Sequence, residues 1–391
     1  MRARPQVMIV AGEASGDMHG AKLAEALITR NRQVDLFGIG GDRMRAAGVR
    51  IEVDAHRLAV VGITEVIAKL PQILDGMRTA KRLIAEHRPD LLILIDFPDF
   101  NLRLAAFAKK HGVPVLYYIS PQIRAWRQGR VRKIRRLVDH MAVILPFEEA
   151  FYRRHGVPVT FVGHPLMDQY HELDRGASQS DSNGVPAIGL MPGSRDSEVR
   201  KLLPLMLAAA RLIGRQKRMR FLLSHAPSVT PNLLQRLVDD ADVDVTLFKG
   251  NTERLLEKVR LVIVASGTST LEAALHETPM IIIYKVSPLS YQLGKVLIRV
   301  PHIGLVNLIA GKRVVPELIQ QEASPEAIAG QAFTLLDDSV RQKAMKTALA
   351  EAARRLGTAG ASDKVAGIAY DLLARSFDRP RISHIKDSHE G

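Results

Sequence analysis

An acidic turn follows one of the most apolar segments of the chain. Asp96 comes directly after the run Leu91–Ile95, and Asp99 follows with Pro98 before it. A carboxylate at the carboxyl end of a buried parallel strand faces the crevice where α/β sheets bind ligands, and proline stiffens the turn. Such a carboxylate is suited to act as a general base. The alternative is structural: Asp99 caps a helix that starts near Asn101, and Asp96 makes a turn hydrogen bond.

A glycine-rich turn follows an earlier apolar run and contains Gly12, Ser15, Gly16 and Asp17. Its glycines would let the backbone turn tightly and approach a ligand, and the next helix would offer its first N–H groups to an anion. The spacing differs from the GxGxxG pattern of dinucleotide-binding proteins, which argues against a nicotinamide dehydrogenase. We therefore expect a ligand-contacting loop here, with a plain tight turn as the alternative.

The second half of the chain repeats this arrangement of an apolar run followed by small and polar residues. Gly193, Ser194 and Arg195 follow one such run, and a guanidinium is a forked donor suited to phosphate. A capped helix with a solvated arginine is the alternative interpretation.

A second phosphate-competent turn lies further along the same half. It contains Ser266, Gly267 and Thr268, and Glu272 follows within the next helical stretch. Backbone amides of this turn could meet phosphate, and Glu272 could accept hydrogen bonds from ribose hydroxyls. A capping box of Ser269 and Glu272 is the structural alternative. Two such turns in one half favour a single nucleotide diphosphate as the ligand.

Ligands for a catalytic metal are sparse in the sequence. The chain has 13 histidines, none with H-x-x-x-H or H-E-x-x-H spacing, and it has no cysteine. Asp96 and Asp99 alone make a poor Mg²⁺ site. We expect no metal and no other cofactor, and His19 is a second candidate for the general base.

An apolar stretch in the first half has helical spacing. Ile63, Val66, Ile67 and Leu70 would lie on one helix face. That face would suit acyl chains or a membrane surface, and core packing is the alternative.

A cationic run extends from Arg124 to Arg136 and includes Trp126 and Arg127. The formal net charge of the chain is +14, so the protein should attract an anionic partner. Tryptophan beside cationic residues suits an anionic lipid surface, and a solvated helix face is the alternative. A nucleic-acid-binding surface would need several aromatic residues among the basic ones, so we expect no nucleic acid partner.

Short β-branched runs alternate with amphipathic stretches in both halves, which is typical of parallel sheets covered by helices. In the first half we predict strands at Val7–Ala11, Leu36–Ile39, Leu91–Ile95, Val115–Ile119, Met141–Leu145 and Thr160–Val162, with helices that include Ala21–Arg30, Leu102–His111 and Phe147–His155. In the second half we predict strands near Ala187–Leu190, Arg220–Leu223, Val243–Leu247, Leu261–Ala265 and Met280–Tyr284, with helices that include Val199–Ile213 and Thr270–His276.

At 391 residues the chain should form two domains. The first apolar run is too short for a signal peptide, and no apolar stretch reaches the roughly 20 residues that span a bilayer. We predict an N-terminal Rossmann-like domain over 1–168, a linker or surface loop over 169–186, a C-terminal Rossmann-like domain over 187–375 whose last helices could return to the first domain, and a polar tail over 376–391.

Taken together, these motifs resemble the lipid A disaccharide synthase family from about Val7 to about Leu373. Each motif alone is weak, but eight of them in the family's order are specific. The segments that carry the resemblance are 11–17, 95–101, 125–127, 145–148, 161–164, 192–195, 265–268 with Glu272, and 307–311.

The resemblance implies an α/β fold of the GT-B type, with two facing Rossmann-like domains and the active site in the interdomain cleft. It implies an inverting transfer of 2,3-diacylglucosamine from its UDP derivative to the 6-hydroxyl of 2,3-diacylglucosamine 1-phosphate. The products would be the β-1,6-linked lipid A disaccharide 1-phosphate and UDP. The alternative is another UDP-amino-sugar enzyme, either a transferase with a different acceptor or an epimerase.

The resemblance further implies a cytoplasmic enzyme, held peripherally at the anionic inner face of the cytoplasmic membrane of a Gram-negative-type cell, and it is compatible with a homodimer. Asp96 and Arg195 match the family's essential carboxylate and arginine, and Arg124 stands where the family usually has a second tryptophan. We expect the UDP-sugar donor at Gly193, Ser194, Arg195, Ser266, Gly267, Thr268, Glu272 and Asn307, and the acceptor at Gly12, Ser15, Gly16, Asp17, Asp99 and Asn101.

Overall fold

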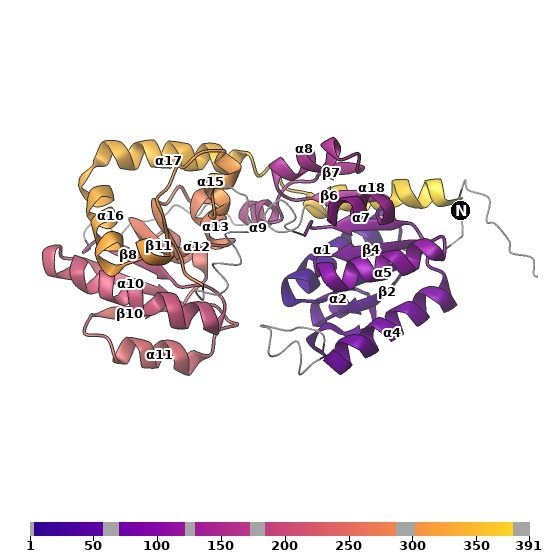
Figure 1. Ribbon diagram of the computed structural model, residues 1–391, viewed down its shortest axis with the longest axis horizontal. Coiled ribbons are helices and arrows are strands. Elements are labelled where there is room, and N and C mark those ends of the chain that lie inside the picture. The colour runs from indigo at the N-terminus through magenta and orange to yellow at the C-terminus, as the bar shows by residue number, and fades with distance from the viewer. Residues whose placement is uncertain (1–3, 58–69, 122–129, 173–183, 287–301, 378–391) are drawn as a thin grey trace, which may run out of the picture. The chain divides into compact units, whose positions relative to one another are not determined.

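The structure is a computed structural model, and it describes residues 4–57, 70–121, 130–172, 184–286 and 302–377. The chain divides into two compact units (Figure 1). The first unit runs to Pro165 and resumes at Ala359, and the second extends from Leu166 to Thr358. Each unit is built on one parallel sheet. The predicted fold class, α/β with two Rossmann-like sheets, is confirmed.

The sheet of the first unit has seven parallel strands in the order β3-β2-β1-β4-β5-β6-β7. Its central strand β4 has the predicted bounds, because an unbroken Leu and Ile run fits a parallel strand that is buried on both faces. The strands are β1 (Gln6–Ala11), β2 (Asp35–Gly40), β3 (Arg50–Asp54), β4 (Leu91–Ile95), β5 (Val115–Tyr118), β6 (His140–Val143) and β7 (Val159–Phe161).

Helices cover both faces of this sheet (Figure 1). Along β1, Met8 and Val10 point to one helical layer, and Val7 and Ile9 point to the other. The layer against Met8 and Val10 contains α4 (Leu70–His87), α5 (Pro98–Lys110), α7 (Arg130–Leu137) and α8 (Pro146–Arg154), and the opposite layer contains α1 (Ala14–Arg30) and α18 (Ala361–Phe377). Two short helices, α2 (Asp42–Ala46) and η1 (Ala55–Arg57), complete the unit.

Helix α18 returns to the first unit after the chain has built the second. Its buried residues Val365 and Ala369 join the core that α1 forms with the sheet. The Tyr370 hydroxyl donates a hydrogen bond to the Leu27 carbonyl oxygen at 2.9 Å. The C-terminal segment is therefore part of the layer that covers β1 and β4.

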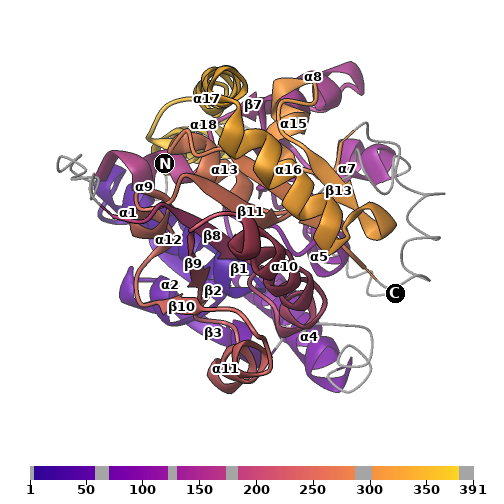
Figure 2. The same ribbon diagram turned by 90° about the vertical axis from the view of Figure 1, so that its left-hand side faces the viewer.

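The second unit contains a six-stranded parallel sheet in the order β10-β9-β8-β11-β12-β13. Figure 2 shows α10 and α16, which are in contact, lying along this sheet. Its strands are β8 (Ala187–Met191), β9 (Arg220–Ser224), β10 (Val245–Phe248), β11 (Leu261–Ala265), β12 (Met280–Tyr284) and β13 (Glu317–Ile319). Its helices are α9 (Leu166–Glu172), α10 (Asp196–Gln216), α11 (Pro231–Asp239), α12 (Thr252–Leu256), α13 (Ser269–Leu275), α15 (Leu305–Ala310), η2 (Gln320–Glu322), α16 (Pro325–Asp337) and α17 (Ser339–Arg354).

Helix α1 begins at Ala14, well before the predicted start at Ala21. Its first turns contain Gly16 and Gly20, which lower helix propensity. Both lie where the packing leaves little space, because a Cβ on Gly20 would be 2.6 Å from the Met44 sulfur. Close packing thus outweighs propensity, and three residues that we expected in a loop are helical: Ser15, Gly16 and Asp17.

The predicted linker over 169–186 falls largely outside the described residues. Its first four residues, 169–172, belong to α9, and residues 184–186 lead directly into β8. Helix α18 takes in the first two residues of the predicted tail, and 378–391 lie outside the described residues. None of the helices in the described ranges has the length and apolar content needed to cross a bilayer.

Candidate active site

Asp96 lies directly after β4 with a left-handed backbone conformation. Its φ is +46°, and that of Phe97, the N-cap of α5, is +47°. Ile119, just beyond the neighbouring strand β5, has a φ of +63°. Non-glycine residues rarely adopt this conformation, β-branched ones least of all, and such strain concentrates at functional sites. The carboxyl ends of two neighbouring strands thus carry the strain expected of an active site.

Two buried side chains hold the backbone of Asp96 in place. The Tyr117 hydroxyl donates to the Asp96 carbonyl oxygen at 2.6 Å, and the Asn101 amide donates to the same oxygen at 2.7 Å. Asn101 also donates to the carbonyl oxygen of Ile95, and the side chains of Asn101 and Tyr117 are fully buried. We expected Asn101 beside the acceptor. Its side chain instead holds the backbone of Asp96 in position.

The environment of Asp96 suits a general base. Burial, together with the negative charge of Glu13, raises the pKa of Asp96 from 3.8 to about 6, against a lowering by the Phe97 backbone amide. A base is most effective when its pKa lies near the working pH while most of it is still ionised. Asp96 meets both conditions at neutral pH.

The turn before α1 approaches Asp96 closely. A Cβ on Gly12 would lie 2.4 Å from the Phe97 ring, so this position leaves room for glycine only. Glu13, the N-cap of α1, brings the charge that acts on Asp96. Ser15 is exposed in the first turn of α1, and Gly16 is buried against Ala11. The glycine-rich turn and the acidic turn therefore form one local site.

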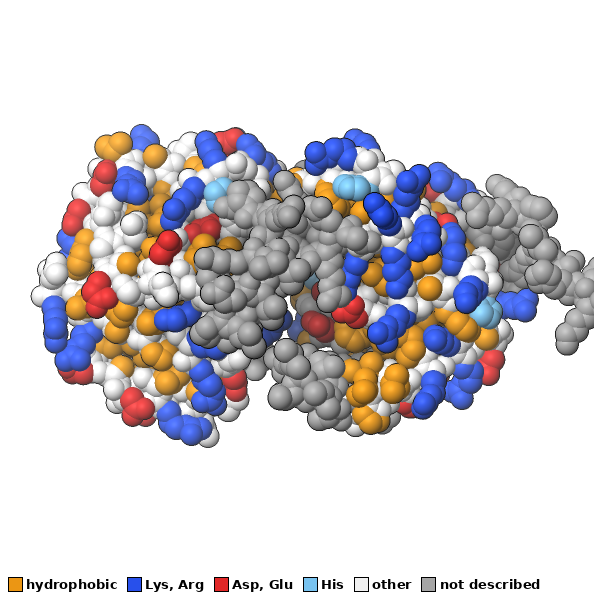
Figure 3. Space-filling view, viewed as in Figure 1, with side chains coloured by type: hydrophobic (Ala, Val, Ile, Leu, Met, Phe, Trp, Pro, Cys, Tyr) orange, Lys and Arg blue, Asp and Glu red, His pale blue; other side chains and the backbone are white. Residues whose placement is uncertain are grey.

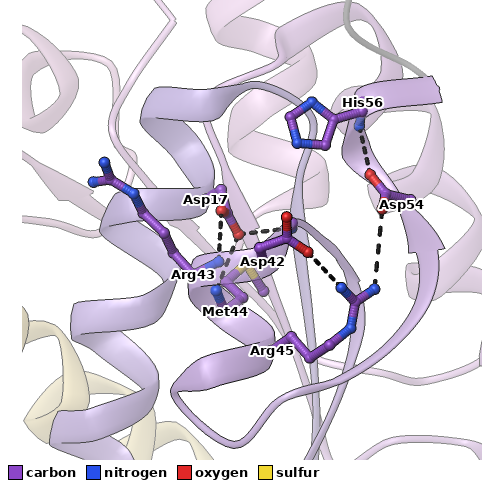
Figure 4. A network of polar contacts seen from close by, with 8 residues as sticks. Asp17, Asp42, Arg43, Met44, Arg45, Asp54 and His56 are labelled. Carbon is purple, nitrogen blue, oxygen red and sulfur yellow. Dashed lines mark hydrogen bonds and ion pairs between the residues drawn. The ribbon is translucent and has the colours of Figure 1, made fainter.

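Asp17 has a structural role that its place in the glycine-rich turn did not indicate (Figure 4). Its buried carboxylate accepts hydrogen bonds from the backbone amides of Gly41, Arg43 and Met44, at 2.6 to 3.1 Å. These are N-terminal amides of α2, which has no cap of its own. We expected Asp17 in the acceptor loop, but its carboxylate caps α2 because helix termini leave such amides without partners.

We expect Asp17→Ala to lower the free energy of unfolding by about 2 to 4 kcal/mol, since a buried charged acceptor and the cap of a helix are lost together. Urea unfolding followed by circular dichroism measures the change. Asp42→Ala is the matched control, because the ion pair of Asp42 with Arg45 is exposed and its loss should cost less than about 1 kcal/mol. Equal effects of the two substitutions would contradict the assignment.

His19 lies near the same sheet edge as Asp96. Its ring packs against that of Tyr118 in an edge-to-face arrangement, with ring centroids 6.3 Å apart. Tyr118 is paired in register with Ile95, the residue before Asp96. His164 is close by, and burial together with His19 lowers the pKa of His164 to about 4. The structure therefore brings both candidate bases to one edge of the first sheet.

Asp99 lies in the first turn of α5 and does not cap this helix, whose N-cap is Phe97. Its largely exposed side chain forms an ion pair with Arg130 of α7. Arg130 thus reaches the acidic turn, a contact that no sequence motif indicated.

In the second unit, the turn after β8 presents Arg195 beside Glu198. Arg195 is the N-cap of α10, and its guanidinium lies 3.4 Å from a Glu198 oxygen. The other Glu198 oxygen accepts a hydrogen bond from the Ser194 amide at 3.1 Å. Gly193 has a φ of +112°, which requires glycine. The Ser194 amide and the Arg195 guanidinium of this turn are both directed at the Glu198 carboxylate, and phosphate binding by the turn stays a prediction.

Residues 228–230 form hydrogen bonds with the turn that contains Ser194 and Asp196. The Ser228 hydroxyl donates to the Ser194 carbonyl oxygen at 2.6 Å, and Asp196 accepts from the Thr230 amide at 3.0 Å and from its hydroxyl at 2.7 Å. These bonds preorganise the loop, so a ligand would meet a largely fixed set of donors.

The turn after β11 differs from the capping box of Ser269 and Glu272 that was the structural alternative for this segment. Thr268 is the N-cap of α13, and Ser269 is already helical. Burial and the charge of Glu253 raise the pKa of Glu272, against a lowering by Ser269. Among the residues that the structure describes, none has an atom within 4 Å of a Cβ placed on Gly267. The Ser266 hydroxyl donates to the Ile303 carbonyl oxygen at 3.1 Å.

Asn307, expected among the donor-binding residues, is fully buried on α15. Its amide nitrogen donates to Val315 and Glu317, and its amide oxygen accepts from the backbone amides of Val314 and Val315. A primary amide has no further strong hydrogen-bonding capacity. Asn307 therefore holds the segment Val314–Glu317, and Glu317 in turn accepts hydrogen bonds from the backbone amides of Ile303 and Gly304.

Glu148 ends one of the segments that carry the family resemblance, but it was not among the predicted site residues. It is almost fully buried in the first turn of α8, and burial raises its pKa to about 8. Its carboxyl accepts from the Leu145 amide at 3.1 Å. The Ser120 hydroxyl, just beyond β5, lies 2.7 Å from the Tyr152 hydroxyl in the same network. In the sequence, a glutamate at this helix position is typical of a capping residue. Only its burial in the structure indicates that it could have another role.

The predicted membrane-facing residues lie mostly outside the described ranges, namely Ile63, Val66, Ile67, Arg124, Trp126 and Arg127. Leu70 and Leu74 are exposed on α4, with 47% and 43% of their surfaces accessible. Figure 3 shows an apolar patch at α4 and many Lys and Arg side chains over the same face of the first unit. Within the described ranges, no three His, Asp or Glu side chains gather to hold a metal ion.

Several solved structures share this architecture. The chain matches a calicheamicin glycosyltransferase with a TM-score of 0.61 at 14% identity, covering 96% of this chain and 99% of the other. It also matches a UDP-GlcNAc 2-epimerase from Neisseria meningitidis bound to UDP-GlcNAc, with a TM-score of 0.55 at 11% identity, covering 95% of this chain and 100% of the other. These likenesses define the fold as that of the GT-B class.

Proteins with a higher sequence identity show the family to which the chain belongs. The family model described as lipid-A-disaccharide synthetase matches residues 7–366. A lipid-A-disaccharide synthase of Geobacter sulfurreducens is 48% identical over 375 residues, covering 95% of this chain and 98% of the relative. One of Syntrophus aciditrophicus is 47% identical over 380 residues with the same coverage. The chain belongs to the lipid-A-disaccharide synthetase family and is a glycosyltransferase.

Proposed function

We propose that this chain transfers 2,3-diacylglucosamine from its UDP derivative to the 6-hydroxyl of 2,3-diacylglucosamine 1-phosphate, and so forms the lipid A disaccharide 1-phosphate and UDP. The names of its relatives support this substrate pair. The observation that carries the proposal is Asp96, whose backbone is strained at the end of a central strand and whose carboxyl has a pKa of about 6. Such a group can deprotonate an alcohol as that alcohol attacks.

In the proposed mechanism, Asp96 accepts the proton of the acceptor 6-hydroxyl while that oxygen attacks the anomeric carbon of the donor. The bond from the anomeric carbon to the β-phosphate oxygen breaks, and the electron pair leaves with UDP. In-line attack inverts the α-linked donor to a β-linked product. His19 is the substitute candidate for the base.

Arg195 and the turn Ser266–Thr268 would stabilise the negative charge that builds on the leaving β-phosphate. A guanidinium with backbone amides can supply this stabilisation in place of a divalent metal. Glu272 would accept hydrogen bonds from the ribose hydroxyls. We therefore propose that the donor binds to the second unit without a metal cofactor.

The test is the dependence of UDP release on the acceptor. Purified protein with UDP-diacylglucosamine should release UDP only when diacylglucosamine 1-phosphate is supplied, and an acceptor with hydrogen in place of the 6-hydroxyl should give none. Equal UDP release without the acceptor would refute the transferase. Epimerised UDP-sugar would favour the UDP-amino-sugar epimerase instead.

We further propose that the first unit binds the anionic inner face of the cytoplasmic membrane, where acylated substrates reside. Helix α7 supports this, because it buries Val131 and Ile134 and exposes Arg132, Arg135 and Arg136. The exposed leucines of α4 provide an apolar surface on the same unit. Basic residues beside apolar ones suit an anionic lipid surface.

Vesicle flotation measures this association. Arg135→Glu with Arg136→Glu should weaken binding to anionic vesicles at least about tenfold, since each basic residue near the surface contributes about 1 kcal/mol. The matched control is Arg215→Glu with Lys343→Glu, which reverses two charges in the second unit. Unchanged flotation of the α7 variant would refute the placement.

A further inference from the structure

Glu198 occupies the donors that the proposed function assigns to the diphosphate of the sugar nucleotide. One of its oxygens accepts from the Ser194 amide at 3.1 Å, and the other lies 3.4 Å from Arg195. A Cβ on Gly193 would lie 2.4 Å from the carboxylate, so glycine lets the carboxylate rest over the turn. An amide and a guanidinium converging on two oxygens of one anion is also how a phosphate is held.

We infer that Glu198 is an intramolecular substitute for the β-phosphate: it neutralises the empty donor turn, leaves when the donor binds, and returns to help displace UDP. This inference rests on the proposed function. Because carboxylate and phosphate carry the same sign and would share the same donors, the two cannot occupy the turn together without strong repulsion.

The contacts of Glu198 are suited to being exchanged. The side chain of Arg195 is 59% exposed and that of Glu198 is 35% exposed. An ion pair this exposed is weak, so a phosphate that makes the same contacts can replace it at small cost. Glu198 would return to its contacts with Ser194 and Arg195 once the product begins to leave.

Tyr284, at the end of β12, borders the same place. Burial, and next the charge of Glu198, raise the pKa of Tyr284. Its strand, β12, is paired with β11, and the turn Ser266–Thr268 follows β11. The charge of Glu198 thus acts as far as the end of β12, and β8 and β11, whose following turns are proposed to hold the diphosphate, are neighbouring strands.

Glu198→Gln tests the inference, because glutamine keeps the size of the side chain and an acceptor for the Ser194 amide but removes the charge. Calorimetry on the full chain should show UDP affinity raised about three- to tenfold, since tenfold corresponds to about 1.4 kcal/mol. Affinity for uridine, which has no phosphate, should stay unchanged. Product inhibition by UDP should strengthen by the same factor.

Asp240→Asn is the matched control, because it removes one negative charge from an exposed position at the end of α11. It should leave UDP affinity unchanged. If Glu198 instead braces Arg195, Glu198→Gln will weaken UDP binding or leave it unaltered, and the inference is overturned while the donor site stands. Failure of the unaltered chain to bind UDP would overturn both.

Discussion

Replacing Asp96 by asparagine is expected to lower kcat by about 10²- to 10⁴-fold, the usual contribution of a positioned general base. Asparagine keeps the shape of the side chain but cannot accept the proton of the acceptor hydroxyl. The backbone contacts from Tyr117 and Asn101 use the Asp96 carbonyl oxygen and should survive. UDP binding, which we assign to the second unit, should therefore be retained. Substantial residual turnover would transfer the role of base to His19.

The pH dependence provides a second readout of the same group. Only ionised Asp96 can act as base, so kcat/KM should fall as pH drops through about 6. The stability of the fold changes with pH in the opposite direction. Because the pKa is higher in the folded protein than in the unfolded chain, the free energy of unfolding falls as pH rises from 3.8 to about 6, by at most about 3 kcal/mol.

Asp96→Asn should consequently lose most of its activity and yet melt at a higher temperature than the unaltered enzyme at neutral pH. Asp75→Asn, on the exposed side of α4, is the matched control and should change neither property. An inactive variant that is also less stable would mean that the carboxyl is needed for folding, and the assignment of a poised base would fail.

Replacing Arg195 by alanine is expected to lower kcat/KM by about 10²- to 10³-fold, the typical loss when one donor to a developing anion is removed. Arg195→Lys should recover little, because an ammonium cannot reproduce the forked geometry of the guanidinium. Affinity for UDP should fall while affinity for uridine stays constant, since only the diphosphate loses a partner.

Arg211→Ala on the same helix is the matched control for Arg195. Arg211 forms a surface ion pair with Asp242 at 2.6 Å and lies two turns or more from the start of α10. Steady-state kinetics should show little effect of its removal. If the two arginine variants lose activity to the same extent, the loss reflects damage to the helix rather than a missing phosphate contact.

The central strands of both sheets could be predicted from the sequence because burial on both faces produces unbroken apolar runs. The bounds of β4, β11 and β12 agree with the structure residue for residue. The edge strands β3 and β13 were not predicted, since the sequence Arg50–Asp54 alternates charged with apolar residues and Glu317–Ile319 is very short. Their pairing depends on neighbouring strands that local sequence does not identify.

The starts of helices were harder to predict than the strands they follow. Helices α1 and α5 begin within the very turns that we took for loops. Glycine and aspartate favour loops in isolation, but packing of α1 on β1 holds Gly16 in a helix. The sequence thus places the candidate site residues at the ends of strands, but it does not show which of them belong to the helix that follows.

The roles of individual polar residues depended on contacts far apart in the sequence. Nothing near Asp17 in the chain reveals that its carboxylate reaches the amides of α2, and nothing near Asn307 reveals the four hydrogen bonds that enclose it. Tyr117 reads as an ordinary strand residue, although its hydroxyl supports Asp96. A motif identifies the polar residues of a site but does not separate those that face a ligand from those that hold the turn.

The measurement that tests the central claim most directly is the NMR spectrum of the product made from UDP-diacylglucosamine and diacylglucosamine 1-phosphate, read together with the amount of UDP released. A base on the first unit and a leaving diphosphate on the second predict one β-1,6-linked disaccharide for each UDP. An α linkage, or UDP formed without disaccharide, would contradict inverting transfer by this pair of sites.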